Sequence, residues 1–121
     1  MSEYLIVFND EWIGEITDEQ LGEAGARVRA LRAEMDEAGV LVYTNGLDTD
    51  IPPFHVDASS GEPVFEDGPY VETKEHLGGF AIVDVADETA ARFWAGKVAV
   101  ACGWPQEVHR FHRRGFRAGQ P

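Results

Sequence analysis

The sequence predicts an α+β fold in which two helices cover one face of a single sheet. Strand-like runs and two long helical patterns alternate in the order β-α-β, hairpin, β-α-β, and no linker or internal repeat divides them. With 121 residues the chain has the size of one domain, so we expect a single domain over residues 1–121. This order of elements is typical of a ferredoxin-like sandwich with an inserted β-hairpin.

The first half of the chain predicts a strand, a helix and a second strand. Residues 4–8 are an apolar run of strand-forming side chains. Thr17 and Gln20 then form a capping box that begins a helix, and Gly39 is suited to end it in the left-handed conformation. Residues 40–44 predict the second strand. One apolar face of this helix is expected to be buried: Leu21, Ala24, Val28, Leu31, Met35 and Ala38.

Two short strand patterns predict the inserted hairpin. Residues 54–57 and 64–66 are rich in β-forming side chains, and they flank a turn of small residues at 58–61. Pro52-Pro53 separates this hairpin from the preceding strand, since proline cannot take part in a central ladder.

The second half predicts a strand at residues 80–85, a helix and a last strand at residues 107–111. Asp87 can cap the helix, and Gly103 can end it. We expect the chain to be flexible after about residue 112. The buried side of this second helix is expected to contain four residues: Ala90, Phe93, Trp94 and Val98.

Composition and charge narrow the function classes. The net charge of −12 would repel nucleic acid and anionic membranes, so neither is an expected partner. No apolar stretch is long enough to span a membrane, and the N-terminus lacks the basic start of a signal peptide. Cys102 is the single cysteine, which excludes an internal disulfide, favours a cytoplasmic protein and suggests a core residue rather than a nucleophile.

The C-terminal tail is the basic part of this acidic chain. Four of its ten basic residues follow Glu107: Arg110, Arg113, Arg114 and Arg117. The tail is a docking segment for an acidic partner, a solvated and frayed segment, or a segment that folds back on the acidic body.

Apolar residues on both faces of the predicted sheet indicate a partner. Tyr4 and Ile6 alternate with Leu5 and Val7, and the strand at residues 80–85 is apolar on both sides as well. Two helices can cover only one face, and soluble monomers rarely expose a large apolar patch. We therefore expect a homodimer in which two sheets pack face to face, unless the loops and hairpin cover the second face within one chain.

Residues 67–80, DGPYVETKEHLGGF, are the most informative segment for function. Asp67 begins a Gly-Pro turn, and a polar run then leads to Gly78-Gly79, where the backbone can approach another group closely. His76 is a candidate acid or base, because an imidazole exchanges protons near neutral pH, and Asp67 is a candidate carboxylate that faces the ligand. The candidate substrate-binding residues are Tyr70, Glu72, Thr73, Lys74, Phe80 and His55.

Each of these residues also has a plain structural interpretation. His76 can be an exposed loop histidine, Asp67 can hold its own turn, and Lys74 can form a weak surface ion pair. Tyr70 and Phe80 can be core aromatics. No paired-cysteine motif or histidine spacing predicts a metal site, and no nucleotide-binding motif predicts a cofactor.

The segment resembles the signature of the YCII-related proteins, in the subgroup named for an Asp-Gly-Pro-Phe motif. The resemblance covers nearly the whole chain to about residue 111. The chain departs from the pattern at Tyr70, at His76 where Gln is common, and at His109 where Arg is common. The matching positions are Asp67, Gly68, Pro69, Glu72, Thr73, Lys74, Glu75, Leu77, Gly78, Gly79 and Phe80.

The resemblance implies a ferredoxin-like fold and a dimeric α+β barrel. A distant relative is a dehydrochlorinase of a chlorinated hydroxyquinol, and histidine–aspartate pairs have been proposed as catalytic in some YCII proteins. Genes of the subgroup often accompany extracytoplasmic-function sigma factors. Two hypotheses follow: a cofactor-free small-molecule binding protein or enzyme of the proton-transfer, elimination or isomerisation type, with a pocket near the motif, or a non-catalytic regulatory protein linked to a sigma factor.

Overall fold

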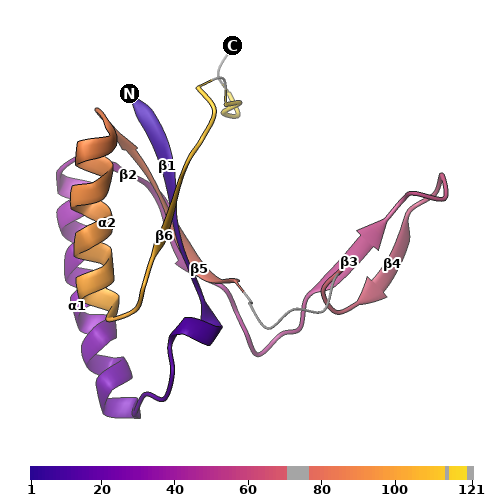
Figure 1. Ribbon diagram of the computed structural model, residues 1–121, viewed down its shortest axis with the longest axis horizontal. Coiled ribbons are helices and arrows are strands. Elements are labelled where there is room, and N and C mark those ends of the chain that lie inside the picture. Colours follow the sequence, from indigo (N-terminus) through magenta and orange to yellow (C-terminus); the bar gives the residue numbers. More distant parts are fainter. Residues whose placement is uncertain (71–76, 114, 120–121) are drawn as a thin grey trace.

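The protein is a two-layer sandwich with a projecting hairpin. A computed structural model describes residues 1–70, 77–113 and 115–119. Two helices, α1 (Asp18–Glu37) and α2 (Glu88–Cys102), cover one face of a four-stranded sheet (Figure 1). The sheet contains β1 (Ser2–Asn9), β2 (Leu41–Gly46), β5 (Leu77–Val85) and β6 (Glu107–Arg110).

The strand order is β2-β5-β1-β6, and all three neighbouring pairs are antiparallel. A short 3-10 helix, Asp10–Trp12, follows β1, and a separate hairpin of β3 (Phe54–Asp57) and β4 (Val64–Asp67) lies between β2 and β5. The predicted ferredoxin-like α+β sandwich with an inserted hairpin is therefore confirmed. The dimeric barrel stays a prediction.

The helices begin and end at the residues that the sequence indicates. Thr17 accepts a hydrogen bond from the Gln20 N–H, while the Gln20 side chain accepts one from the Thr17 N–H. Gly39 follows the end of α1 with φ of 73°, in the left-handed region that favours glycine. Asp87 caps α2 through the Ala90 N–H at 2.9 Å, and Gly103 ends it with φ of 81°. The N-cap side chains of Thr17 and Asp87 each contribute about 1 kcal/mol.

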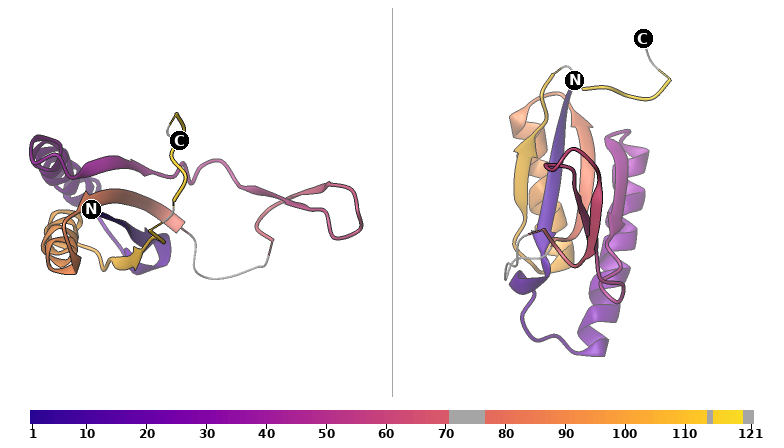
Figure 2. Two further views of the ribbon diagram at one scale, coloured as in Figure 1. Left: turned by 90° about the horizontal axis from the view of Figure 1, so that it is seen from above. Right: turned by 90° about the vertical axis from the view of Figure 1, so that its right-hand side faces the viewer.

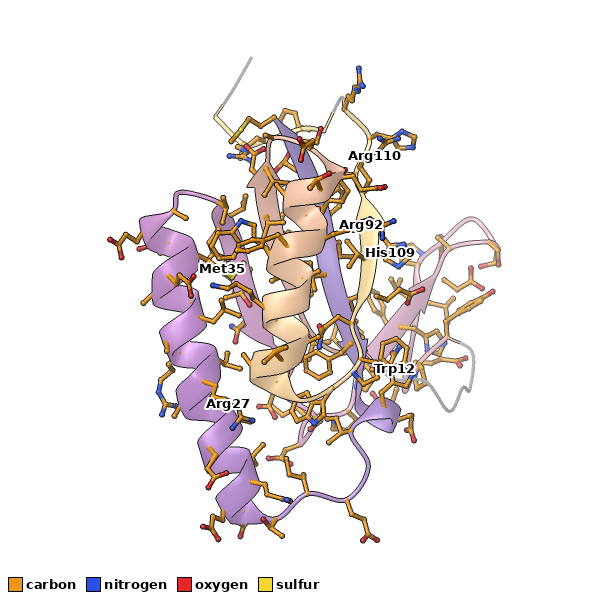
Figure 3. All side chains as sticks on the ribbon, turned by 60° about the vertical axis from the view of Figure 1, so that its left-hand side comes forward. Trp12, Arg27, Met35, Arg92, His109 and Arg110 are labelled. Carbon is orange, nitrogen blue, oxygen red and sulfur yellow. The ribbon has the colours of Figure 1, made fainter. Side chains whose placement is uncertain are left out.

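The core lies between the helices and the sheet. Ile6 of β1 lies opposite Ala81 of β5, and Tyr4 lies opposite Val83. These residues point towards the helices, where Ile6, Val83 and Val85 are at most 1% exposed. Met35 of α1 points into the same layer (Figure 3). Burying each of these aliphatic side chains contributes about 1.5–3 kcal/mol relative to leaving it in water.

Three expectations about buried helix residues were wrong. Leu21 is 50% exposed, because the first turns of α1 extend past the end of the sheet (Figure 1). Phe93 is 56% exposed on the outer side of α2, where it packs edge-on against Trp94 and beneath the Lys97 ammonium. Small residues form most of the buried side of α2: Ala91, Ala95 and Ala101, together with Trp94. Ala38, at the end of α1, is likewise exposed.

The sheet face opposite the helices carries apolar side chains that neither helix covers, and among them Tyr43 is 52% exposed whereas Val7 is only 7% exposed. Leu5 and Val7 of β1 lie opposite Ile82 and Phe80 of β5, and Tyr43 of β2 lies opposite Ile82. We call these five residues the open face. The Tyr43 and Phe80 rings lie 6.1 Å apart on it.

The β3–β4 hairpin does not cover the open face. It stands away from both layers, and in the view from above it lies at the opposite end of the molecule from the helices (Figure 2). Phe54, Val56 and Phe65 share one side of this hairpin and are 68%, 51% and 65% exposed. The hairpin is therefore an apolar arm with little packing of its own, and two-stranded hairpins are only marginally stable alone.

Close packing requires glycine at residue 79, the second of the glycine pair in residues 67–80. A Cβ atom at Gly79 would lie 3.0 Å from Phe8 Cε1 and 3.1 Å from both Asn45 O and Gly46 Cα. Gly78 accepts a hydrogen bond from the Leu47 N–H at 2.9 Å. The close approach that the glycines permit is thus between β5, β2 and Phe8.

Candidate functional site

The base of the β3–β4 hairpin holds His55 between two acceptors. Its Nδ1 atom lies 2.9 Å from the Gly68 carbonyl oxygen, and its Nε2 atom lies 3.5 Å from Glu66 Oε2. A carbonyl can only accept, so Nδ1 carries the proton and Nε2 faces the carboxylate. The Tyr70 ring meets the imidazole edge-on at 5.6 Å. These contacts fix the histidine and connect the hairpin to the turn of the motif.

Asp67 ends β4 and is exposed to solvent. The turn after it is closed by the Gly68 N–H, which donates to the Pro53 carbonyl at 2.8 Å, and Gly68 has φ of 94°. Within residues 1–70, 77–113 and 115–119, the Asp67 carboxylate has no hydrogen-bond partner. The backbone therefore holds this turn, as glycine in the left-handed region allows.

Four of the predicted site residues lie outside the described residues: Glu72, Thr73, Lys74 and His76. Of the others, Tyr70 is 69% exposed beside His55, and Phe80 is in β5. The structure thus brings His55 and Tyr70 together at the hairpin base and puts Phe80 in the sheet.

A cavity of about 240 Å³ lies between the helices and the sheet, at the end where β2 and β1 finish. We call it the helix–sheet cavity. Its walls come from both helices, from three strands and from the segment after α2. The lining residues that matter here are Ile6, Phe8, Val28, Met35, Val98 and Trp104, with Arg32, Thr44, Phe80 and Cys102.

Local contacts hold the walls of this cavity. The Phe8 and Trp104 rings pack at 5.0 Å between centroids. Thr44 Oγ1 donates to the Phe80 carbonyl at 2.9 Å and so closes the strand side. Arg27 Nε donates to the Ala101 carbonyl at 3.0 Å, and Figure 3 shows Arg27 reaching from α1 towards the end of α2. Because this guanidinium binds the negative end of the α2 dipole, it also joins the two helices beside the cavity.

The residues that line the helix–sheet cavity are suited to binding a ligand rather than to catalysis. Burial raises the pKa of the Cys102 thiol, and the nearby Arg27 guanidinium offsets only part of that rise. A thiol with a raised pKa is a weak nucleophile, which agrees with the expectation of a core residue. Arg32 is the one charged side chain among the residues described around the cavity. The cavity can therefore enclose an apolar group and offer one cation at its edge.

Of the predicted site residues that the structure describes, only Phe80 lines the helix–sheet cavity, and its ring packs with Tyr43 on the open face. His55 and Asp67 are in the hairpin strands, which lie apart from the helices, and Tyr70 follows β4 (Figure 1). Sequence reasoning assigned Val28, Leu31 and Met35 to the buried side of a helix, which is correct. The same periodicity does not distinguish a filled core from a cavity wall.

Neither a metal site nor a membrane span is found in the described ranges. Within them, no group of three or more histidine, cysteine, aspartate or glutamate residues could hold a metal ion. No helix there is long and apolar enough to cross a membrane.

Comparison with protein families matches the chain to the YCII-related domain over residues 4–101. The match runs from β1 to the penultimate residue of α2, and it includes the hairpin and residues 67–80. A search of the curated proteins found no match.

Proposed function

Because the chain belongs to the YCII-related family, we propose that it is a small-molecule binding protein whose ligand occupies the helix–sheet cavity. The observation that carries this proposal is the apolar cavity of about 240 Å³ between the helices and the sheet. An apolar cavity of roughly 150 Å³ accommodates benzene. The volume therefore suits a molecule with one substituted ring or a chain of similar size.

Catalysis in this cavity would need a group that exchanges protons. The described lining offers only a thiol of raised pKa and a guanidinium, and neither is suited to acid–base work near neutral pH. His76 stays the predicted acid or base, and Asp67 stays the predicted ligand-facing carboxylate. Their support is the sequence, in which His76 immediately precedes β5 and Phe80 of β5 borders the cavity. A cofactor-free proton transfer, elimination or isomerisation is the chemistry that these residues would serve.

A matched pair of substitutions on α2 tests the location of the ligand. Val98 is half-buried and lines the cavity, whereas Val100 is 78% exposed on the same helix. Native mass spectrometry of protein purified from its own host should show a small stoichiometric adduct. We expect Val98→Phe to lose this adduct because the ring fills the cavity, while Val100→Phe keeps it. An adduct that survives Val98→Phe places the ligand elsewhere.

We also propose that the protein is a homodimer in which two open faces pack together. Support comes from the apolar residues of the open face, of which Tyr43 is 52% exposed. Packing two such faces together would remove this apolar surface from water.

Sedimentation equilibrium tests the dimer. Ile82→Lys places a charge in the middle of the open face, so we expect it to give a monomer. Val100→Lys adds the same charge on the exposed side of α2 and should leave the dimer intact. A wild-type protein that is monomeric at micromolar concentration contradicts the proposal.

The second candidate function is a non-catalytic regulatory protein that binds another protein, such as an extracytoplasmic-function sigma factor. The observation that favours it is the exposed apolar side of the β3–β4 hairpin, formed by Phe54, Val56 and Phe65. The basic tail gives less support, because Arg117 is paired with Glu3 and the Phe111 N–H donates to the Glu3 carbonyl. Titration of the purified sigma factor should show binding that Phe54→Ser with Phe65→Ser abolishes. Binding that survives this double substitution but is lost on deletion after Phe111 would assign the contact to the tail instead.

A further inference from the structure

The helix–sheet cavity has a cation at its edge. Arg32 belongs to the exposed side of α1 and still lines the cavity beside Thr44 and Asn45 of β2. Because β2 is an edge strand, this corner between α1 and β2 is the margin of the sandwich. Arg32 therefore has an aliphatic stem next to the apolar walls and a charged end that remains accessible to water.

The Arg32 guanidinium has no ion-pair partner in the described part of the chain, although the protein carries a net charge of −12. Two other cations of the helices are already engaged. Lys97 binds Glu34, which lies two residues from Arg32 on α1, and Arg27 binds the Ala101 carbonyl. Asp36 lies one helical turn further along α1, at the i+4 position, and makes no ion pair with Arg32 in the described chain. The five donors of Arg32 are therefore free to bind a ligand.

The neighbouring neutral groups add no charge, and Thr44 offers no donor to a carboxylate. Thr44 Oγ1 uses its proton on the Phe80 carbonyl, so its lone pairs can only accept. Gln106 lines the cavity and donates to the Trp104 carbonyl at 3.2 Å. A planar guanidinium matches a carboxylate with two parallel hydrogen bonds, and this match is stronger beside an apolar wall than in water.

We propose that the helix–sheet cavity binds an apolar carboxylic acid, with a single ring or a chain of similar size among Ile6, Phe8 and Trp104 and its carboxylate on Arg32. This inference rests on the proposed function, since it names the class of ligand for the same cavity. It assigns Arg32 a positioning role, in which the guanidinium fixes the orientation of the acid.

Two ligands of the same shape test the charge requirement. Phenylacetate and phenylacetamide differ in charge but hardly in size, so each is titrated into the protein and followed by the indole N–H resonance of Trp104, which Trp104→Phe identifies. We expect the acid to bind more tightly than the amide by roughly tenfold or more, the size of a charge-assisted hydrogen bond.

Substitutions on α1 assign that preference to one residue. Arg32→Gln should remove the tenfold preference and leave the affinity of the amide unchanged. Arg29→Gln removes the same charge from the same helix at an exposed residue that does not line the cavity, and it should change neither affinity by more than about twofold.

The outcomes separate the two proposals. If acid and amide bind equally, or if Arg29→Gln weakens the acid as much as Arg32→Gln does, the carboxylate inference is overturned while the cavity remains a binding site. If neither ligand perturbs Trp104, both the carboxylate inference and the single-ring ligand of the proposed function are overturned.

Discussion

The helix-covered half of the sheet and the β3–β4 hairpin use similar apolar residues in opposite ways. Trp94 of α2 is 9% exposed within the core, whereas Phe65 of β4 is 65% exposed on the hairpin. The apolar residues of α2 recur at helical spacing, and those of the hairpin alternate along its strands. Only α2 has a second layer, the sheet, to pack against. An apolar pattern therefore predicts a face that needs cover, and whether that cover comes from the same chain is a tertiary question.

Truncating one aromatic residue in each region should give the largest difference. Trp94→Ala is expected to lower the free energy of unfolding by about 3–5 kcal/mol because it leaves a hole in the core. Phe65→Ala should lower it by less than about 0.5 kcal/mol in the monomer. Urea denaturation of both variants measures the two values.

The Phe65→Ala variant also tests whether the hairpin packs on a second copy of the chain. If the hairpin packs on a second copy, Phe65→Ala should weaken dimerisation in sedimentation experiments while leaving the stability of the monomer unchanged. A loss of several kcal/mol in the monomer would mean that the hairpin is part of the single-chain core.

Substituting two glycines by alanine should have the next largest effects on stability, because Gly79 is closely packed and Gly96 faces open space. Gly79→Ala should destabilise the protein by about 1–3 kcal/mol, because its Cβ would press on Phe8, Asn45 and Gly46. Gly96→Ala on α2 meets open space and should stabilise the helix by about 0.5–1 kcal/mol. Thermal denaturation should move in opposite directions for the two variants, and a shift of the same sign would refute this account of Gly79.

The smallest expected effect concerns the turn of the hairpin. The Ser59 N–H, 2.9 Å from Asp57 Oδ1, and the Ser59 hydroxyl lower the pKa of Asp57 below its ordinary value of 3.8. A lowered pKa in the folded state means that the turn is stabilised above pH 3.8 and loses this support as the pH falls through the lower, folded value.

Titration of the Asp57 carboxyl by NMR checks this direction. Ser59→Ala keeps the larger backbone contribution, so the pKa should rise only part of the way towards 3.8. Ser60→Ala is the control, since its hydroxyl donates to the Glu62 carbonyl and not to Asp57. An unchanged pKa in Ser59→Ala would leave the backbone N–H as the whole cause.

Much of the fold could be predicted because its signals are local. Thr17, Gly39, Asp87 and Gly103 act within one helical turn, so the sequence was sufficient to give both ends of each helix. Strand boundaries were less accurate. β5 begins at Leu77 rather than residue 80, because pairing with β1 and β2 extends the strand through the two glycines.

The candidate site could be predicted less well. The segment after Asp67 is predicted as a site because its polar and titratable side chains can be identified from the sequence. The helix–sheet cavity is built mainly from apolar residues that look like ordinary core in the sequence. Arg32 shows the difficulty. Its position on the exposed side of α1 predicts a solvated charge, and only the adjacent β2 strand puts it at the edge of a cavity.

The sequence by itself determined the helices and strands, the residues that begin and end each helix, the apolar character of both sheet faces and the family. These properties depend on neighbours along the chain, through periods of two and 3.6 residues and through caps that reach three residues. Tertiary structure alone decided that Phe93 is exposed, that Gly79 packs against β2, and that a cavity remains between α1, α2 and the sheet. Those outcomes depend on how closely whole layers approach each other, which is set by the summed shapes of side chains far apart in the sequence.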